Sequence, residues 1–311
     1  MPDDASRVSR INPDLPRRPP PDAHAMNYRH SFHAGNYGDV FKHTLLVWLL
    51  RALQRKDKGF LYLDTHAGRG AYDLRAAPGR ADRPPEWPQG IGRVWKAATL
   101  PPALADYLGM VRKFDASAGA GGDRPRLYPG SPWLAALMRR PQDRLAVWEQ
   151  QPAEAVALRA EFARRRRVAV VRGDGYRALR ALLPPPERRA LVFIDPPFEA
   201  QGEFDAILDA LGESLQRFPS GVYAVWYPVT DRARVKAFHA GLQVLAPPPT
   251  LWAELAVTAD PQVRMKGCGL LVINPPWRLA DELQRLLPAL AGILGLDAGA
   301  AGRIAWLVPE G

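Results

Sequence analysis

The stretch Phe60-Leu-Tyr-Leu-Asp-Thr-His-Ala-Gly-Arg-Gly70 joins an apolar run directly to a turn that contains two glycines. The apolar residues predict a buried strand ending at Asp64, because a short apolar run bounded by turn residues is typical of a parallel sheet. Glycine lets the backbone of such a turn come close to a ligand. Many α/β loops look similar, so an ordinary structural turn fits this stretch about as well as a binding site does.

Apolar runs and helical patterns alternate along the rest of the chain. Further strands are predicted at residues 145–148, 168–171, 190–194, 222–226, 251–257, 269–273 and 303–308. Helical patterns are found at residues 39–53, 152–166, 175–183 and 204–218. This alternation predicts an α/β fold with a largely parallel sheet, which binds ligands at the carboxyl ends of its strands.

Two segments do not follow this alternation. Residues 72–127 contain no convincing buried strand, but show short helical patterns, and a loop of that length is improbable in a compact domain. We therefore expect a small, mostly helical insertion at about 72–127. Residues 1–25 are rich in proline and lack hydrophobic periodicity, which predicts a disordered tail before a folded domain at 26–311.

The composition is that of a folded protein with a polyanionic partner. Hydrophobic residues make up 47% and charged residues 24% of the 311 residues, which excludes a fibrous or wholly disordered chain. The single cysteine, Cys268, is expected to be a buried structural thiol. The sequence contains no run of 18 apolar residues and no apolar signal-peptide region, so we expect a cytoplasmic protein. The net charge of +10 favours nucleic acid, although biased genome composition would also produce it.

The glycine turn also narrows the class of cofactor. The G-x-G-x-x-G pattern of dinucleotide sites is absent, which disfavours a pyrophosphate. A turn of this kind instead suits an adenosine-type cofactor without phosphates, such as S-adenosylmethionine. Two acidic residues follow later predicted strands: Glu149 is placed to hold ribose hydroxyls, and Asp174, before Gly175, to hold an adenine amino group. Either could equally be an ordinary helix cap.

The stretch Val192-Phe-Ile-Asp-Pro-Pro-Phe198 ends another apolar strand. Two prolines fix the backbone after Asp195, so that its carboxylate and the Pro196 carbonyl are rigidly aimed. These two acceptors fit the hydrogens of an exocyclic amino group while the Phe198 ring stacks on the base, which predicts methylation of an amino nitrogen. A purely structural Asp-Pro turn is the less favoured reading.

A similar motif occurs at Val272-Ile-Asn-Pro-Pro-Trp277. Asn274 could serve methylation of an amino or amide nitrogen in principle. The preceding strand is close enough in sequence to be an antiparallel partner, which would bring Asn274 to the opposite edge of the sheet from Asp195. We therefore predict a structural role for Asn274.

Residues 28–43 concentrate histidine, lysine and tyrosine side chains before and within the first predicted helix. Metal binding has no supporting cysteine or HExxH-type spacing, so stacking on nucleic acid and contact with phosphates by residues such as Tyr28 and Lys42 is preferred. The basic run Arg164–Arg167 could be a solvated face or part of an RNA groove.

These motifs together resemble the bacterial RlmJ family, the 23S ribosomal RNA adenine-N6 methyltransferases. The resemblance covers residues 26–310 and rests on Tyr28–Asn36, Asp39–His43, Leu61–Gly68, Tyr128–Pro132, Ile194–Phe198 and Trp226–Pro228. It implies a Rossmann-like class I S-adenosylmethionine-dependent methyltransferase domain with an inserted small helical subdomain. It also implies a 23S rRNA substrate. We expect this RNA to be free or at an early stage of assembly, and the protein to be a monomer without metal or membrane association.

The resemblance also assigns site residues. It implies cofactor contacts from His43, His66, Ser131, Glu149 and Asp174, to which the adjoining Gly68 and Gly175 are added. It implies that Asp195 is the catalytic acceptor, with Pro196 and Phe198 beside it, and that Tyr28 lies at the substrate entrance. From the N-terminal cluster we expect Lys42 to bind substrate as well. The family usually has tyrosine at the position of Phe198, and a Glu-Leu-His-Pro pattern where this chain has residues 148–152. The tail before Met26 is an addition.

Three other functions remain open. DNA adenine methylation uses the same Asp-Pro-Pro-aromatic logic, and only the N-terminal cluster and the resemblance favour RNA. A non-catalytic RNA-binding factor would be expected to carry a degenerate motif, whereas this one is intact. Protein glutamine methylation favours asparagine rather than Asp195 before the two prolines.

Overall fold

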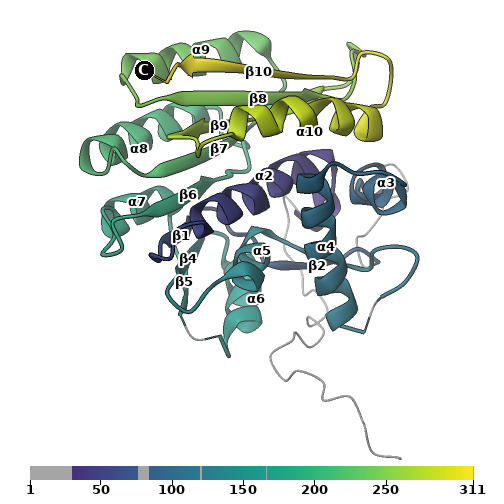
Figure 1. Cartoon of the computed structure of the whole chain (residues 1–311), viewed down its shortest axis with the longest axis horizontal. Coiled ribbons are helices and arrows are strands. Elements are labelled where there is room, and N and C mark those ends of the chain that lie inside the picture. The colour runs from purple at the N-terminus through teal and green to yellow at the C-terminus, as the bar shows by residue number, and fades with distance from the viewer. Residues whose placement is uncertain (1–29, 76–83, 120, 166, 311) are drawn as a thin grey trace, which may run out of the picture.

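An eight-stranded mixed sheet forms the centre of the molecule (Figure 1). The computed structural model describes residues 30–75, 84–119, 121–165 and 167–310. The strand order is β10-β8-β9-β7-β6-β1-β4-β5, and the strands from β7 to β5 are mutually parallel. The bounds are β1 (Leu61–Asp64), β4 (Arg144–Glu149), β5 (Val168–Arg172), β6 (Ala190–Ile194), β7 (Val222–Val229), β8 (Thr250–Ala256), β9 (Gly267–Ile273) and β10 (Ala301–Val308). The predicted α/β fold is confirmed.

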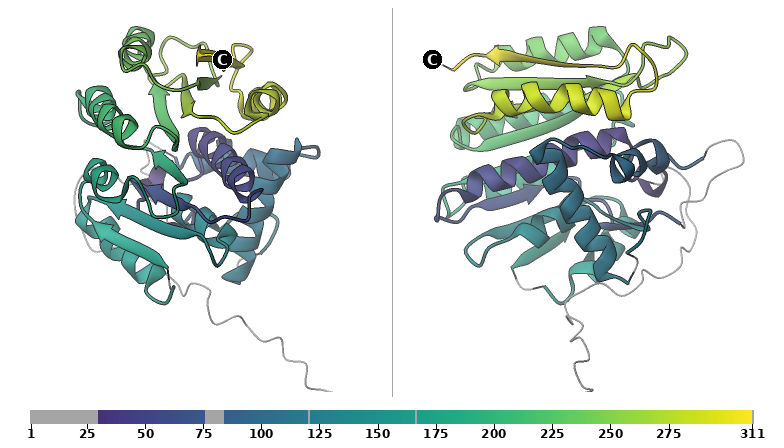
Figure 2. Two further views of the ribbon diagram at one scale, coloured as in Figure 1. Left: turned by 60° about the vertical axis from the view of Figure 1, so that its left-hand side comes forward. Right: turned by 45° about the vertical axis from the view of Figure 1, so that its right-hand side comes forward.

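Helices cover both faces of this sheet (Figure 2). One face packs against α2 (Tyr37–Gln54), α5 (Ser131–Met138), α6 (Pro152–Phe162) and α10 (Leu279–Leu294), and the other against α7 (Gly175–Leu182), α8 (Glu203–Arg217) and α9 (Arg232–Val244). Alternate strand residues supply the two cores: Tyr62 belongs to the first, and Leu61 and Leu63 to the second. Burial on both faces explains why β1 is a continuous apolar run.

Some boundaries differ from those predicted. Helix α6 ends at Phe162 rather than at residue 166, because Leu158 and Phe162 are its last residues in the core. Two three-residue strands, β2 (Ala71–Asp73) and β3 (Leu127–Pro129), pair at the ends of the segment expected to lack strands. They were missed because three residues are too few to show a strand period.

The segment between these short strands is mainly helical where the structure describes it. It contains η1 (Trp87–Gln89), α3 (Ile91–Lys96) and α4 (Pro102–Ser117), and α4 packs against α2 through residues such as Leu104 and Leu108. That these residues form an inserted subdomain stays a prediction. The expected tail at 1–25 lies outside the described residues, and the short helix α1 (His30–His33) precedes α2.

The second proline motif, which contains Asn274, lies at the end of the strands opposite to Asp195. Strand β9 runs antiparallel to both β7 and β8, so Asn274 follows the strand end that lies beside the beginning of β7. Its amide donates hydrogen bonds to the carbonyls of Pro219 and Gly221, both at 2.7 Å. The prediction that Asn274 lies at the opposite end of the strands from Asp195 is confirmed, and these hydrogen bonds agree with a structural role.

Two further expectations concern single features of the chain. Cys268 is fully buried on β9, as predicted, and burial raises the pKa of its thiol to about 12. Among the described residues, no helix is both long enough and apolar enough to span a membrane.

Gly175, the first residue of α7, touches the glycine turn. A Cβ at this position would lie 1.9 Å from the Thr65 carbonyl oxygen, so the Gly175→Ala variant should lose about 1–3 kcal/mol of unfolding free energy in urea titrations. Gly109 in α4 has no atom within 4 Å of its Cβ position, and Gly109→Ala should instead gain about 0.8 kcal/mol. Equal stability of the two variants would contradict this close approach.

Candidate active site

The predicted site residues that the structure describes gather at the carboxyl edge of the parallel strands. Asp64 and Glu149 end β1 and β4, and Asp195 directly follows β6. Ser131 and Gly175 begin α5 and α7, and His43 and Lys42 lie on α2. Tyr28 is outside the described residues.

The glycine turn is tied to the end of β4 through a carboxylate. The Gly68 N–H donates to Glu149 Oε2 at 2.8 Å, and the Gln151 N–H donates to Oε1 at 2.7 Å. Gly68 and Gly70 both have positive φ, +61° and +87°, which is why glycine is needed there. Burial raises the Glu149 pKa, while its backbone hydrogen bonds oppose that rise. A carboxylate has about four acceptor sites, so Glu149 can still accept a hydrogen bond from a ligand hydroxyl.

Asp64 links β1 to the beginning of α5. Its Oδ2 accepts hydrogen bonds from Ser131 Oγ at 2.6 Å and Tyr62 Oη at 2.8 Å, and its Oδ1 accepts the His66 N–H at 3.3 Å. Complete burial raises the pKa of Asp64 to about 7, although the two hydroxyl donors act to lower it. Asp64 therefore fixes both the turn and the N-terminus of α5.

His66 and Asp174 lie where the glycine turn meets α7. Burial lowers the pKa of His66 to about 4, and its Nδ1 is 2.8 Å from Thr65 Oγ1. The His66 ring meets the Tyr176 ring edge-on at 5.1 Å. Asp174 is the N-cap of α7 and accepts the Tyr176 N–H at 2.9 Å. The cap interpretation of Asp174 is thus observed, and a role in ligand binding is compatible with it because the carboxylate is partly exposed.

Lys42 is a buried ammonium between two carboxylates. Its Nζ lies 2.6 Å from Asp195 Oδ2 and 2.8 Å from Asp39 Oδ1, and 5.1 Å from the centre of the Trp226 ring. Burial by itself lowers the Lys42 pKa, but the two carboxylates outweigh it and raise the pKa above its ordinary value. Lys42 is therefore charged, and it holds Asp195 against α2.

Phe198 has an unusual backbone conformation, with φ at +52°. Its ring contacts those of Phe204 at 5.0 Å and Trp226 at 5.9 Å, both edge-on. Pro196 is buried and Phe198 is partly exposed. The two prolines and the aromatic neighbours together hold the strained conformation in which the Phe198 ring is presented.

His43 is connected to α4 by a chain of hydroxyl groups. Its Nδ1 is 2.7 Å from Tyr128 Oη, which is 2.9 Å from Tyr107 Oη, and all three side chains are buried. Tyr128 belongs to β3 and Tyr107 to α4, so the segment between β2 and β3 orients a side chain of the site.

Several residues of this arrangement were not predicted as site residues. Asp39 could have been found from its position three residues before Lys42, since that spacing places both on one helix face. Trp226 was noted only as part of a motif, and Tyr107 has no local signal that distinguishes it. Among the described residues, no three His, Cys, Asp or Glu side chains are grouped so that they could hold a metal.

Parallel strands, a glycine turn linked to an acidic residue after the next strand, and a rigid Asp-Pro-Pro-Phe loop together define a Rossmann-like class I methyltransferase fold. The sequence profile of the family described as "Ribosomal RNA large subunit methyltransferase D, RlmJ" matches residues 57–308. The chain belongs to this family, and the predicted resemblance is confirmed.

Individual relatives agree with the family profile. Two proteins called "Ribosomal RNA large subunit methyltransferase J", from Escherichia coli K12 and Haemophilus influenzae, are 41% and 40% identical to this chain. Each match covers 92% of this chain and the whole of the relative. A crystal structure of protein LPL1258 from Legionella pneumophila is 35% identical with a TM-score of 0.77, covering 88% of this chain and 97% of that one.

The hydroxyl chain can be tested with a double-mutant cycle. Tyr128→Phe and Tyr107→Phe should each cost about 1–3 kcal/mol of unfolding free energy, because a buried polar partner is left unsatisfied. The double variant should cost less than the sum of the two by at least about 0.5 kcal/mol.

The matched control for this cycle is Tyr223, another fully buried tyrosine, whose hydroxyl donates to the Phe218 carbonyl at 2.8 Å on the other face of the sheet. The effects of Tyr223→Phe and Tyr107→Phe should be additive. Additivity of Tyr128→Phe and Tyr107→Phe as well would disprove the coupling.

The lowered pKa of His66 predicts a pH-dependent contribution to stability. Between pH 6.5 and about 4, the unfolded chain binds a proton at this residue and the folded protein does not, so His66 destabilises the fold as the pH falls through this window. The unfolding free energy of wild type minus that of His66→Asn should therefore rise with pH between 4 and 6.5, by up to about 1.4 kcal/mol per unit, and be constant above. A difference that is flat from pH 4 to 8 would refute a buried neutral imidazole.

Proposed function

We propose that this protein transfers a methyl group from S-adenosylmethionine to N6 of an adenine in 23S ribosomal RNA. The observation that carries the proposal is the rigid Asp195–Phe198 loop, with its carboxylate held by Lys42 at 2.6 Å on the edge that also carries the glycine turn. The names of the two relatives, which are large-subunit methyltransferases that match along their whole length, support a ribosomal RNA substrate.

The residues of the glycine turn fit a cofactor of the adenosine type. Glu149, fixed by the Gly68 and Gln151 N–H groups, would accept the ribose hydroxyls. Asp174 and the beginning of α7 at Gly175 would hold the adenine moiety, with the neutral imidazole of His66 beside them. Further contacts would come from Ser131 and His43. When bound, S-adenosylmethionine supplies an electrophilic methyl group on a positively charged sulfur.

The Asp195–Phe198 loop would bind the target base. The Asp195 carboxylate and the Pro196 carbonyl would accept the two N6 hydrogens, which draws the nitrogen lone pair out of conjugation with the ring. The ring of Phe198 would stack on the flipped adenine. Phenylalanine provides this stacking surface without the hydroxyl of the tyrosine that is usual in the family.

Lys42 would act on the reaction as a positioning residue. Its ammonium is buried against Asp195 and Asp39, so it is not disposed to bind a phosphate of the substrate directly. It would instead fix the direction of the Asp195 oxygens. Tyr28 remains a proposed substrate contact at the entrance.

Related proposals follow from the substrate. A ribosomal RNA substrate implies action in the cytoplasm, and we propose that the protein works as a monomer on free or early-assembly 23S RNA. A DNA substrate is the alternative against which the assay below discriminates.

Methyl transfer from radiolabelled S-adenosylmethionine to protein-free 23S transcript and to duplex DNA, followed by digestion to nucleosides, tests the proposal. N6-methyladenosine from RNA alone is expected. Its formation from DNA alone, or the absence of methyl transfer to RNA and to early ribosomal particles despite cofactor binding, would reject the proposal.

Asp195→Ala should lower kcat for methyl transfer by at least about 100-fold, because an acceptor aimed at the reacting amino group is lost. Cofactor affinity, measured by calorimetry, should stay within about twofold of wild type, a change of about 0.4 kcal/mol, because the proposed cofactor contacts come from other residues such as Glu149 and Asp174. Asp195→Asn, which keeps the side-chain size beside Lys42, separates the loss of catalysis from any loss of folding.

The matched control for this variant is Asn274→Ala in the second Pro-Pro motif, which should retain methyl transfer. Loss of cofactor binding in both Asp195 variants would show that Asp195 does not have the assigned role.

A further inference from the structure

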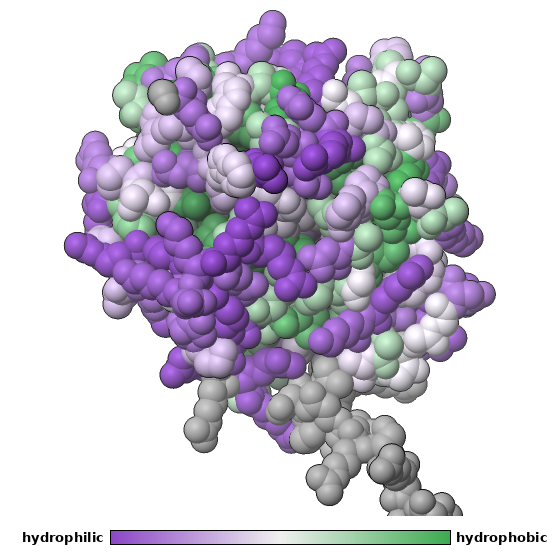
Figure 3. Space-filling model, in the orientation of Figure 1, coloured by the Kyte–Doolittle hydropathy of each residue, from purple (hydrophilic) through white to green (hydrophobic). Residues whose placement is uncertain are grey.

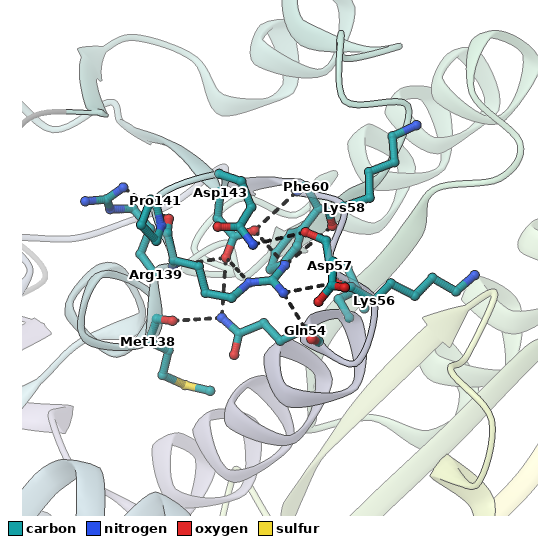
Figure 4. Close-up of polar contacts among 12 residues, drawn as sticks. Gln54, Lys56, Asp57, Lys58, Phe60, Met138, Arg139, Pro141 and Asp143 are labelled. Carbon is teal, nitrogen blue, oxygen red and sulfur yellow. Dashed lines mark hydrogen bonds and ion pairs between the residues drawn. The ribbon is translucent and has the colours of Figure 1, made fainter.

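A cluster of arginines lies at the edge of the sheet opposite the site, where the parallel strands begin (Figure 4). The Arg140 guanidinium donates to three backbone carbonyls, those of Gln54 at 3.0 Å, Lys56 at 2.9 Å and Lys58 at 3.4 Å. It also binds Asp143 at 3.0 Å. These contacts close the end of α2 and fix the turn into β1, which gives the cluster a structural role.

The neighbouring arginines also bind neutral carbonyls. Arg189 donates to the carbonyls of Leu53, at 2.7 Å, and Lys58, and Arg167 donates to that of Pro141. A carbonyl satisfies the hydrogen bonds of a guanidinium but leaves its charge uncompensated. Burial and the nearby charge of Arg140 lower the pKa of Arg189, in keeping with crowded like charges.

The net charge of the chain is concentrated at this edge. We call residues 55–58, 139–144, 163–165, 167 and 187–189 the basic edge; eleven of these residues are Lys or Arg, and three are Asp or Glu. The loops that leave the parallel strands at the site are residues 65–70, 150–151, 173–174, 195–202 and 230–231. They contain one Arg and four Asp or Glu. The basic edge therefore carries a net charge of +8, whereas the loops at the site carry −3.

The basic edge also presents cations to solvent. Lys56, Lys58 and Arg188 are exposed, and Figure 4 shows the ammonium groups of Lys56 and Lys58 pointing away from the arginine cluster. In Figure 3, a continuous hydrophilic area covers the lower left part of the molecule, on the side where the last turn of α2 lies in Figure 1. These like charges repel one another. A polyanion that binds across all four loops would neutralise them.

We propose that the basic edge binds phosphates of the RNA substrate at a distance from the target adenine. The inference rests on the proposed function. RNA binding depends on Lys and Arg side chains that neutralise the phosphates of the RNA. Because the loops at the site are net acidic, the basic edge is better suited to supply these contacts. Strand β4 spans six residues, about 20 Å at 3.3 Å per residue, so one RNA must extend along the molecule to reach both edges.

The test removes three exposed charges without touching the arginine network. Lys56→Gln, Lys58→Gln and Arg188→Gln are combined, since the network uses only the backbone carbonyls of the two lysines. The matched control combines Lys113→Gln, Lys236→Gln and Arg303→Gln, three exposed cations on α4, α9 and β10, for the same change in net charge.

Binding of fluorescently labelled 23S transcript is measured at several salt concentrations. The basic-edge variant should bind at least about tenfold more weakly than wild type, and the slope of log K against log salt should fall by about 2, since each phosphate contact contributes about 0.7. The control variant should change neither value by as much as half of this. In the methyl-transfer assay, KM for the transcript should rise while kcat and cofactor affinity stay unchanged.

Equal losses in the two variants would overturn the proposal, because net charge alone would then explain the binding. Unchanged RNA affinity in the basic-edge variant would overturn it as well, and weakened binding of a polyglutamate peptide without a change for RNA would indicate an acidic protein partner instead. Because RNA binding is measured without turnover, an absence of methyl transfer would count against the proposed reaction and not against this surface.

Discussion

A buried ammonium paired with two carboxylates determines how the catalytic edge is assembled. A charge removed from water is tolerated in a protein interior only when it is closely paired, and Lys42 has Asp39 on its own helix and Asp195 on the loop after β6. The packing of α2 on the sheet therefore fixes the position of the Asp-Pro-Pro loop at the same time. The same helix carries His43 toward β3, so a single packing contact aligns both halves of the site.

The sheet separates two tasks by direction. Strand ends collect the acidic and neutral polar groups suited to a positively charged cofactor and an amino group, whereas strand beginnings collect arginines that cap α2 and remain charged. Parallel strands make this separation possible, because every loop of one kind lies on the same edge. The antiparallel strands β8, β9 and β10 extend the sheet without adding to either edge in this way, as Asn274 illustrates.

The sequence was sufficient to locate the eight strands of the main sheet along the chain and the acidic residues at the ends of three of them. Asp64, Glu149 and Asp195 could be placed because each follows an apolar run, and parallel pairing brings such residues together. The Lys42 contact with Asp195 could not be predicted, because it joins residues 153 positions apart whose helix and loop carry no pairing signal. Tyr107 was hidden for the same reason, within a generic helical pattern, and β2 and β3 were too short to be detected.

The Tyr107 contact has a consequence for how the family can vary. Loops between β2 and β3 can change in length, since the pairing of those strands closes the segment independently of its interior. Helix α4 cannot change its register so freely: one inserted or deleted residue turns every later side chain by about 100° around the helix axis. Such a change upstream of Tyr107 would carry its hydroxyl away from Tyr128. The loops of this segment can therefore vary in length, whereas the rotation of α4 that points Tyr107 toward Tyr128 cannot.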